Sequence, residues 1–234
     1  MIRRIGTLAI VLGLGVLAWT GTVLVWKDPF TTAYTAYQQR RLDGDLERTF
    51  AEWRPAPPRT TEEPRNGKPP KNPASTEIPK LSPAAMRREA SRFEAATGPG
   101  DAIARLAIDR IDVDVVVVNG TDANELRKGP GRHLETAMPG EGELVYIAGH
   151  RTTYGAPFSR IDQLDRGDAI FLELPYASIE YEVTRSRIVD QYEVSVLESR
   201  GREELVLQAC HPRFFASHRY LVYARPVNVN AKRS

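Results

Sequence analysis

Apolar residues dominate the first 26 positions of the chain, and their pattern predicts a membrane-spanning helix. The stretch from Ile5 to Trp26 contains no charged residue. At 1.5 Å per residue, a helix of this length spans about 33 Å, enough to cross a hydrocarbon core of roughly 30 Å. Arg3 and Arg4 precede it and place residues 1–4 in the cytoplasm by the positive-inside tendency. A cleaved signal peptide is the alternative, but its apolar region is normally shorter. We therefore expect an uncleaved anchor over residues 5–26.

The next segment, residues 27–54, has the pattern of an amphipathic helix. Large apolar residues recur every three to four positions between Tyr34 and Trp53, with charged residues between them. We expect a juxtamembrane stalk helix here. A regulatory or oligomerising segment is the alternative.

Residues 55–81 form a proline-rich linker. The stretch 55–80 holds eight prolines and almost no large apolar residue, so it cannot bury enough surface to offset its ordering entropy. We expect an extended, semi-rigid spacer that holds the following domain away from the membrane. Ser82 and Pro83 then predict the N-cap and first turn of a short helix within residues 82–97, which Gly98 ends.

Beyond residue 98 the pattern changes to short apolar strands separated by Pro, Gly and Asp. Only one further short helix is expected, at residues 123–128. So many strands in about 130 residues indicate an all-β fold: a closed or nearly closed, largely antiparallel β-barrel of seven to eight strands that fills residues 98–234. The predicted strands are 102–108, 115–118, 144–148, 169–174, 179–183, 204–209 and 220–224.

Charge and cysteine content exclude several classes of protein. The chain has 32 basic and 30 acidic residues, a net charge of +2, and no basic stripe with interleaved aromatic residues. This balance does not fit a nucleic-acid-binding protein. The single cysteine, Cys210, excludes an intrachain disulfide scaffold and a cysteine-rich zinc site.

Cys210 is also the strongest candidate for chemistry. It lies at the end of an apolar run and just before Pro212, where a thiol can be partly exposed and still held rigidly. A thiolate nucleophile needs a nearby cation or general acid, and His150 is a candidate for this role. Arg219, which opens the next apolar run, could hold a developing oxyanion. The alternative is that Cys210 is only a small buried apolar residue.

The strings around these residues resemble those of the sortases, membrane-anchored cysteine transpeptidases of Gram-positive bacteria. The family's signature is Thr-Leu-x-Thr-Cys, with an Arg opening the next strand and a His far upstream; this chain has Val206-Leu-Gln-Ala-Cys210 and lacks both threonines. The resemblance covers roughly residues 101–227 well. The matching strings, which look like the class E branch of actinobacteria, are Trp26-Lys-Asp-Pro-Phe30, Leu126-x-x-Gly129-Pro-Gly131, Thr136-Ala-Met-Pro139-Gly140, Ala148-Gly-His-Arg-Thr-Thr153, Ala156-Pro-Phe158, Leu164-x-x-Gly167-Asp168 and Cys210-His-Pro212 with Arg219-Tyr220.

The resemblance implies a role for each candidate. Cys210 would attack the carbonyl of the Thr–Gly bond in a C-terminal sorting signal similar to Leu-Pro-x-Thr-Gly or Leu-Ala-x-Thr-Gly. His150 would protonate the leaving amine and then deprotonate the incoming amine, while Arg219 would bind the substrate backbone or the oxyanion. Ala209, Thr152 and Tyr154 are further candidates for substrate contact.

The resemblance also implies partners and a location. The partners would be secreted proteins with sorting signals, the amine of a peptidoglycan precursor, and the membrane through residues 5–26. The N-terminus would be cytoplasmic and the catalytic domain extracellular. We expect no nucleic-acid partner, no cofactor and no metal, and we interpret Glu141, Glu143, Asp162, Asp165 and Asp168 as solvated acidic residues, with a calcium site as the alternative.

Two other functions remain open from the sequence. One is a cysteine hydrolase on the same fold, which cleaves without transfer. The other is a membrane-tethered β-domain without catalysis, in which Cys210 would be buried and distant from His150 and Arg219.

Overall fold

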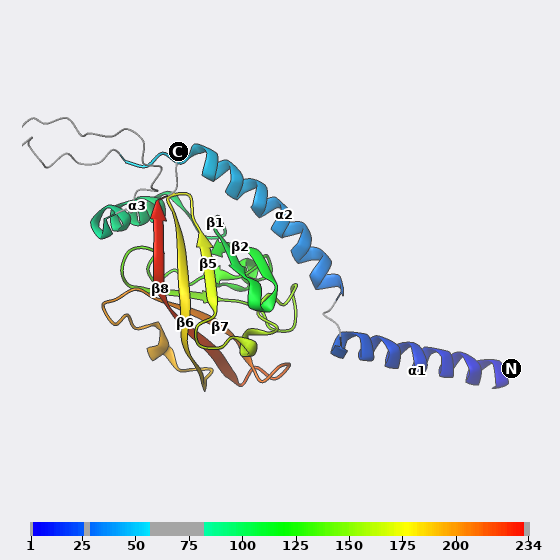
Figure 1. Ribbon diagram of the computed structural model, residues 1–234. Coiled ribbons are helices and arrows are strands. Elements are labelled where there is room, and N and C mark those ends of the chain that lie inside the picture. The colour runs from blue at the N-terminus through cyan, green and yellow to red at the C-terminus, as the bar shows by residue number, and fades with distance from the viewer. Residues whose placement is uncertain (1, 26–28, 57–81, 232–234) are drawn as a thin grey trace, which may run out of the picture.

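The structure is a computed structural model that describes residues 2–25, 29–56 and 82–231 (Figure 1). The predicted barrel is confirmed: eight strands close in the order β1-β2-β3-β4-β7-β8-β6-β5. Two parallel pairings, β2 with β3 and β4 with β7, interrupt an otherwise antiparallel barrel. The strands are β1 (Ala102–Ile108), β2 (Val113–Asn119), β3 (Gly131–Arg132), β4 (Leu144–Ala148), β5 (Ala169–Glu173), β6 (Ala177–Asp190), β7 (Glu204–His211) and β8 (His218–Ala231).

All seven strands predicted from the sequence are present, with two differences. The strand β3 was missed because its two residues are too short to show an alternating pattern. Strands β6 and β8 are 14 residues long, far longer than their apolar runs. Their polar ends pair with each other from Ala177–Ala231 to Asp190–His218, so backbone pairing, not burial, extends them.

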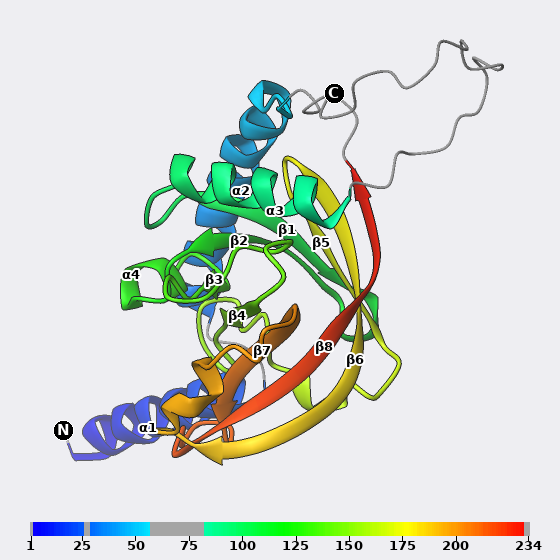
Figure 2. The same ribbon diagram turned by 90° about the vertical axis from the view of Figure 1, so that its left-hand side faces the viewer.

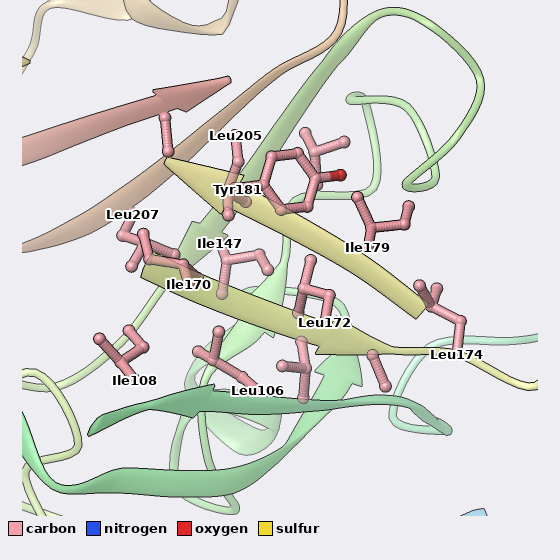
Figure 3. Packing of buried hydrophobic residues seen from close by; sticks show 14 of the residues in the cluster. Leu106, Ile108, Ile147, Ile170, Leu172, Leu174, Ile179, Tyr181, Leu205 and Leu207 are labelled. Carbon is pink, nitrogen blue, oxygen red and sulfur yellow. The ribbon is translucent and has the colours of Figure 1, made fainter. Parts of the chain in front are cut away.

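The barrel core is built from one face of each strand. Along β7, Leu205, Leu207 and Ala209 belong to the buried core cluster, while the residues between them point to the other face. Figure 3 shows Leu205 and Leu207 packed among apolar side chains from β1, β4, β5 and β6. Fully burying one such large side chain contributes about 1.5–3 kcal/mol, so this interior holds the strand ends in place.

One end of the barrel is covered by the helix α3 (Pro83–Ala96). The Oγ atom of Ser82 accepts a hydrogen bond from the amide of Ala85 at 3.3 Å, as the predicted N-cap requires. Met86 and Phe93 face the core and join its buried cluster. The remaining short helices are α4 (Ala123–Leu126), η1 (Asp109–Ile111), η2 (Ile161–Gln163) and η3 (Val194–Leu197).

The N-terminal helix α1 (Ile2–Val25) has the length and composition of a membrane span. Within it, the window Arg4–Gly21 has a mean hydropathy of 1.5, and none of this window is buried by the rest of the protein. An apolar helix that is left entirely uncovered agrees with insertion into a bilayer.

The second helix, α2 (Pro29–Glu52), packs against the outside of the barrel beside β1 and β2 (Figure 1). Leu42 and Leu46 are buried there against a cluster that includes Val116. The side-chain amide of Gln39 accepts a hydrogen bond from the Val116 amide at 2.7 Å and donates one to its carbonyl at 3.0 Å. Arg105 of β1 also forms an ion pair with Asp43. Helix α2 therefore belongs to the folded unit.

The packed position of α2 bears on the expected arrangement of a stalk helix followed by a spacer. Residues 57–81 of the linker lie outside the described residues, but both ends of the segment are attached to the same body. The amide of Ala56 donates to Glu89 of α3 at 3.0 Å, and the Trp53 ring meets Phe93 edge-on at 5.2 Å. The helices α2 and α3, which flank the linker, therefore both pack on the barrel.

Candidate active site

Cys210 lies near the end of β7, on the outer face of the barrel. Side chains alternate along the strand, so the inward position of Ala209 turns Cys210 outward. The thiol is partly exposed and forms no disulfide. A thiol in this position can be reached by a substrate, which disfavours the alternative of a purely structural, buried cysteine.

Arg219 is the direct cross-strand partner of Cys210. The two residues face each other in the antiparallel pair of β7 and β8. Directly opposed side chains share a face, with Cβ atoms about 4.5–5.5 Å apart. The Nη1 atom of Arg219 donates to the carbonyls of Ala216 at 2.7 Å and His218 at 3.0 Å, which holds the guanidinium at the loop between β7 and β8.

His150 follows β4, the other neighbour of β7 (Figure 2). The strands β4 and β7 run parallel, with Ala148 opposite Gln208, and the amide of Gly149 donates to the Gln208 carbonyl at 2.9 Å. His150 and Cys210 each lie two residues beyond this last matched pair, so the parallel register brings both to the same end of the barrel. Burial lowers the pKa of His150, and the positive charge of Arg127 lowers it further.

Gly149 is required by the close approach of an aromatic ring. A Cβ atom on Gly149 would lie 2.5 Å from the ring of Phe158. Phe158 is fully buried and its amide donates to the His150 carbonyl at 3.1 Å. The glycine lets this ring pack directly under the residue that carries the imidazole.

Arg151 connects the segment after β4 to the end of β7. Its Nη1 atom donates to the carbonyl of Cys210 at 3.3 Å and lies 2.9 Å from Nδ1 of His211, while Nη2 pairs with Asp162 at 2.7 Å. The side chain is only 3% exposed. Sequence reasoning assigned no role to Arg151, and its position directly after His150 was the signal that could have pointed to it.

The outer face beside Cys210 carries an apolar cluster under the loop between β6 and β7. Tyr146 of β4 and Tyr223 of β8 belong to it, and Leu197 of η3 packs against it. Burial raises the pKa of Tyr146, as does the neighbouring Tyr223, while the positive charge of Arg219 acts in the opposite direction. Arg219 thus lies where this apolar surface meets the thiol.

The three candidate residues for substrate contact lie in different surroundings. The side chain of Ala209 is fully buried in the barrel core, on the face opposite to Cys210, so it offers no surface to a substrate. Thr152 is half-buried in the loop after His150. The Tyr154 ring lies 5.0 Å from the His150 ring. The main-chain amide of Tyr154 donates a hydrogen bond to the Thr31 hydroxyl of α2 at 3.0 Å.

His211, Asp162 and Asp168 have surroundings of their own, away from the thiol. His211 points to the face opposite to Cys210, where burial and the charge of Arg151 lower its pKa. Asp162 pairs with Arg151, and Asp168 lies 3.8 Å from Arg110. Over residues 2–25, 29–56 and 82–231, no three His, Cys, Asp or Glu side chains gather in a way that could hold a metal ion.

A closed barrel with a thiol, an imidazole and a guanidinium at the ends of three neighbouring strands defines a cysteine-dependent acyl-transfer enzyme. The comparisons with known proteins give the family. The model of the sortase domain matches residues 106–227. The chain is 34% identical to sortase D of Bacillus subtilis over 139 residues. The matched region covers 58% of this chain and 68% of that protein. It is 29% identical over 157 residues to sortase SrtE1 of Streptomyces coelicolor, and this match covers 60% of this chain and 44% of that protein.

Solved structures agree with this result. A sortase D5 transpeptidase of Clostridium perfringens has a TM-score of 0.55 and 29% identity, covering 60% of this chain and 88% of that one. Sortase E of Streptomyces avermitilis has a TM-score of 0.53 and 28% identity, and the match covers 58% of this chain and 93% of that one. The chain belongs to the sortase family and is a cysteine transpeptidase of cell-wall protein sorting.

Proposed function

We propose that this sortase cleaves the Thr–Gly bond of a C-terminal sorting signal with Cys210 and transfers the new acyl group to an amine of a cell-wall precursor. The observation that carries the assignment is the cross-strand pair of Cys210 and Arg219 beside the end of β4, where His150 follows. This arrangement supports the proposal, because it brings a thiol, an imidazole and a guanidinium to one end of the barrel.

In the first half of the reaction, the Cys210 thiolate attacks the threonine carbonyl carbon. The carbonyl oxygen takes the negative charge, and the guanidinium of Arg219, which stays protonated, stabilises it. His150 holds the proton that the Cys210 thiol gave up on becoming the thiolate, and as the C–N bond breaks it passes this proton to the leaving glycine nitrogen. The products are a thioester on Cys210 and a free amine.

In the second half, an incoming amine attacks the thioester carbonyl. His150 takes the proton that the amine loses, and the Cys210 thiolate leaves as the amide forms. Burial disfavours the imidazolium, so the neutral imidazole is available as the base for this step. The net reaction exchanges one amide bond for another without hydrolysis.

The partners follow from this chemistry and from the anchor. Secreted proteins with sorting signals would supply the acyl group, and a peptidoglycan precursor would supply the amine. Arg3 and Arg4 favour a cytoplasmic N-terminus, which puts the barrel outside the cell. We keep residues 5–26 as the anchor, 27–54 as the juxtamembrane helix, 55–81 as the linker and 98–234 as the catalytic domain, with the helix in 82–97 packed on it.

The class E branch is the preferred assignment within the family. It rests on the motifs after Leu126 and around His150, and it predicts a preference for Leu-Ala-x-Thr-Gly over Leu-Pro-x-Thr-Gly. The relatives include both a sortase D and a sortase E, so the choice between the two signals is part of the test.

The experiment uses the full chain in lipid nanodiscs with fluorogenic peptides that carry either signal, with and without an amine acceptor. We expect peptide cleavage, a thioester adduct on Cys210 detected by mass spectrometry, and an amide product when the amine is present. The variant Cys210→Ala should lose both the adduct and the turnover, and Ser217→Ala on the neighbouring loop serves as the control. Free acid as the sole product, even with amine, would assign a hydrolase instead. No adduct with either peptide would contradict the proposed function.

A further inference from the structure

The loop between β7 and β8 exposes two consecutive phenylalanine side chains. Phe214 is 53% exposed and Phe215 is 81% exposed, although both are large and apolar. Arg213 precedes them and is also exposed, with its guanidinium 5.6 Å from the centre of the Phe214 ring. From His211 to Pro226 the sequence contains no acidic residue. We call residues 213–215 the aromatic tip.

The backbone of the loop is shaped so that the tip stands out from the barrel. Phe214 has a φ of 74° and Ala216 a φ of 53°, a left-handed conformation that residues with a Cβ rarely adopt. The amides of Phe215 and Ala216 both donate to the carbonyl of Pro212 at 3.2 Å, and Arg219 donates to the Ala216 carbonyl. The turn is therefore held by specific contacts, and such unfavourable conformations are typical of functional segments.

This loop lies at the end of the barrel that the membrane helix reaches. Helix α1 ends at Val25, and Thr31, six residues later, already contacts the loop that follows His150 through the amide of Tyr154. Six residues span at most about 20 Å. In both Figure 1 and Figure 2, the loop between β7 and β8 lies at the barrel end nearest to α1.

The barrel cannot swing freely away from this position on α2. The helix is bound to β2 by the two hydrogen bonds between Gln39 and Val116, and to β1 by the ion pair of Asp43 with Arg105. Thr35 adds a hydrogen bond to the carbonyl of Arg127 at 2.9 Å. The start of α2, only four residues beyond the end of α1, thus keeps a fixed place beside the catalytic end.

We propose that the aromatic tip docks into the headgroup region of the bilayer that holds α1. Aromatic rings concentrate at membrane interfaces, and basic side chains beside them are attracted to anionic lipids. The tether keeps the tip at a high local concentration of lipid, so two rings and one arginine suffice for docking. The loop itself adds no negative charge, because His211–Pro226 contains no acidic residue; the acidic residue opposite its base is Asp190 of β6, which pairs with His218. The docked tip holds the end of β7, and so Cys210, at the membrane surface.

The test measures the depth of a nitroxide label in the full chain, reconstituted into nanodiscs with anionic and zwitterionic lipids. In a Cys210→Ala background, the label is attached through Phe215→Cys, so that the apolar ring of the nitroxide side chain replaces the phenyl ring that the substitution removes. The matched control carries it through Val227→Cys, which is exposed on the distant half of β8. We expect the ratio of oxygen to nickel-chelate collision rates to be several-fold higher at 215 than at 227. Adding Arg213→Glu should lower this ratio in anionic discs and leave it unchanged in zwitterionic ones.

Equal ratios at the two positions in both kinds of disc would overturn the proposal. Protection at 215 that appears only after a sorting peptide is added would overturn it as well, and would assign the tip to substrate binding. Protection that requires two chains in one disc would assign the tip to self-association. The measurement needs no turnover, so its result is independent of whether the proposed transpeptidation is correct.

Discussion

The Nη1 atom of Arg151 lies 3.3 Å from the main-chain oxygen of Cys210. The residue directly after His150 is thus hydrogen-bonded to the residue that carries the thiol, although the two belong to different segments of the chain. The second nitrogen of the same guanidinium pairs with Asp162 at 2.7 Å, which fixes its orientation. One buried side chain therefore sets the spacing between the imidazole and the thiol.

The first prediction concerns this spacing. Arg151→Met keeps the length of the side chain but removes the charge and its hydrogen bonds, each of which contributes about 1.5–3 kcal/mol when a charged group is involved. We expect kcat to fall by about 10²-fold, because small misplacements of reacting groups have effects of this size. Arg151→Lys should recover part of kcat. The measurement is peptide turnover, with circular dichroism to correct for the folded fraction. A loss that only follows the unfolded fraction would show that Arg151 is purely structural.

The second prediction separates the roles of Arg219 and His150. Arg219→Lys keeps the charge but loses the planar fork, and we expect kcat/KM to fall by about 10²–10³-fold, the size of one lost oxyanion contact. His150→Ala should lose about 10²–10⁴-fold or more, because proton transfer to the leaving amine fails. Arg225→Lys is the control, since Arg225 lies on the same strand but pairs with Glu182. If both site variants stay within about threefold of the parent, far below the general acid–base range, the proposed roles are wrong.

The third prediction concerns the protonation of His150. Burial lowers its pKa first and Arg127 lowers it further, so Arg127→Gln should move the pKa up toward the ordinary value without reaching it. The hydrogen bond from Thr35 uses only the Arg127 carbonyl and survives the change. The measurement is an NMR titration of the histidine ring protons in a Cys210→Ala background. The pKa of His211 should stay the same, because burial and the charge of Arg151, not Arg127, lower it. A His150 titration that is identical in both proteins would contradict the electrostatic effect of Arg127.

The fourth prediction follows from the same lowered pKa. As the pH falls through about 6.5, the ordinary value for histidine, the unfolded chain binds a proton at position 150 before the folded chain does. The free energy of unfolding should therefore decrease from pH 6.5 downward until the pH passes the lowered pKa, and be insensitive to this group above pH 6.5. His150→Gln should remove that part of the dependence. Denaturant unfolding of the parent protein and of His150→Gln at several pH values measures this dependence. If the free energy of unfolding changes with pH equally in the two proteins, the effect is excluded.

The fifth prediction concerns the linker. Proteases should cut first within residues 55–80, because a proline-rich segment without apolar residues has nothing to bury. The fragment that carries α2 should nevertheless stay bound to the barrel through Gln39, Leu42 and Leu46. Denaturing gels should show two fragments, while size exclusion in detergent shows one particle. Gln39→Ala together with Leu46→Ala should release the fragment. Separation of the nicked parent protein would contradict the docking of α2.

Much of this protein could be predicted from local sequence patterns. The long apolar helix at the N-terminus, the capped helix after Ser82 and seven of the strands each follow from residues that are close together in the chain. The single cysteine and the strings around it were sufficient to identify the family. These features depend on local propensity, hydrophobic period and side-chain chemistry, which a single segment already contains.

Only the tertiary structure decided how these segments meet. The pairing of Gln39 with Val116 helps to hold α2 against the outside of the barrel, although its sequence pattern fits a free stalk equally well. The parallel register of β4 and β7 determined that Arg151 reaches Cys210 and that Ala209 faces the core. Long-range contacts of this kind depend on which surfaces are left to be covered once the whole chain has folded, and no local pattern contains that information.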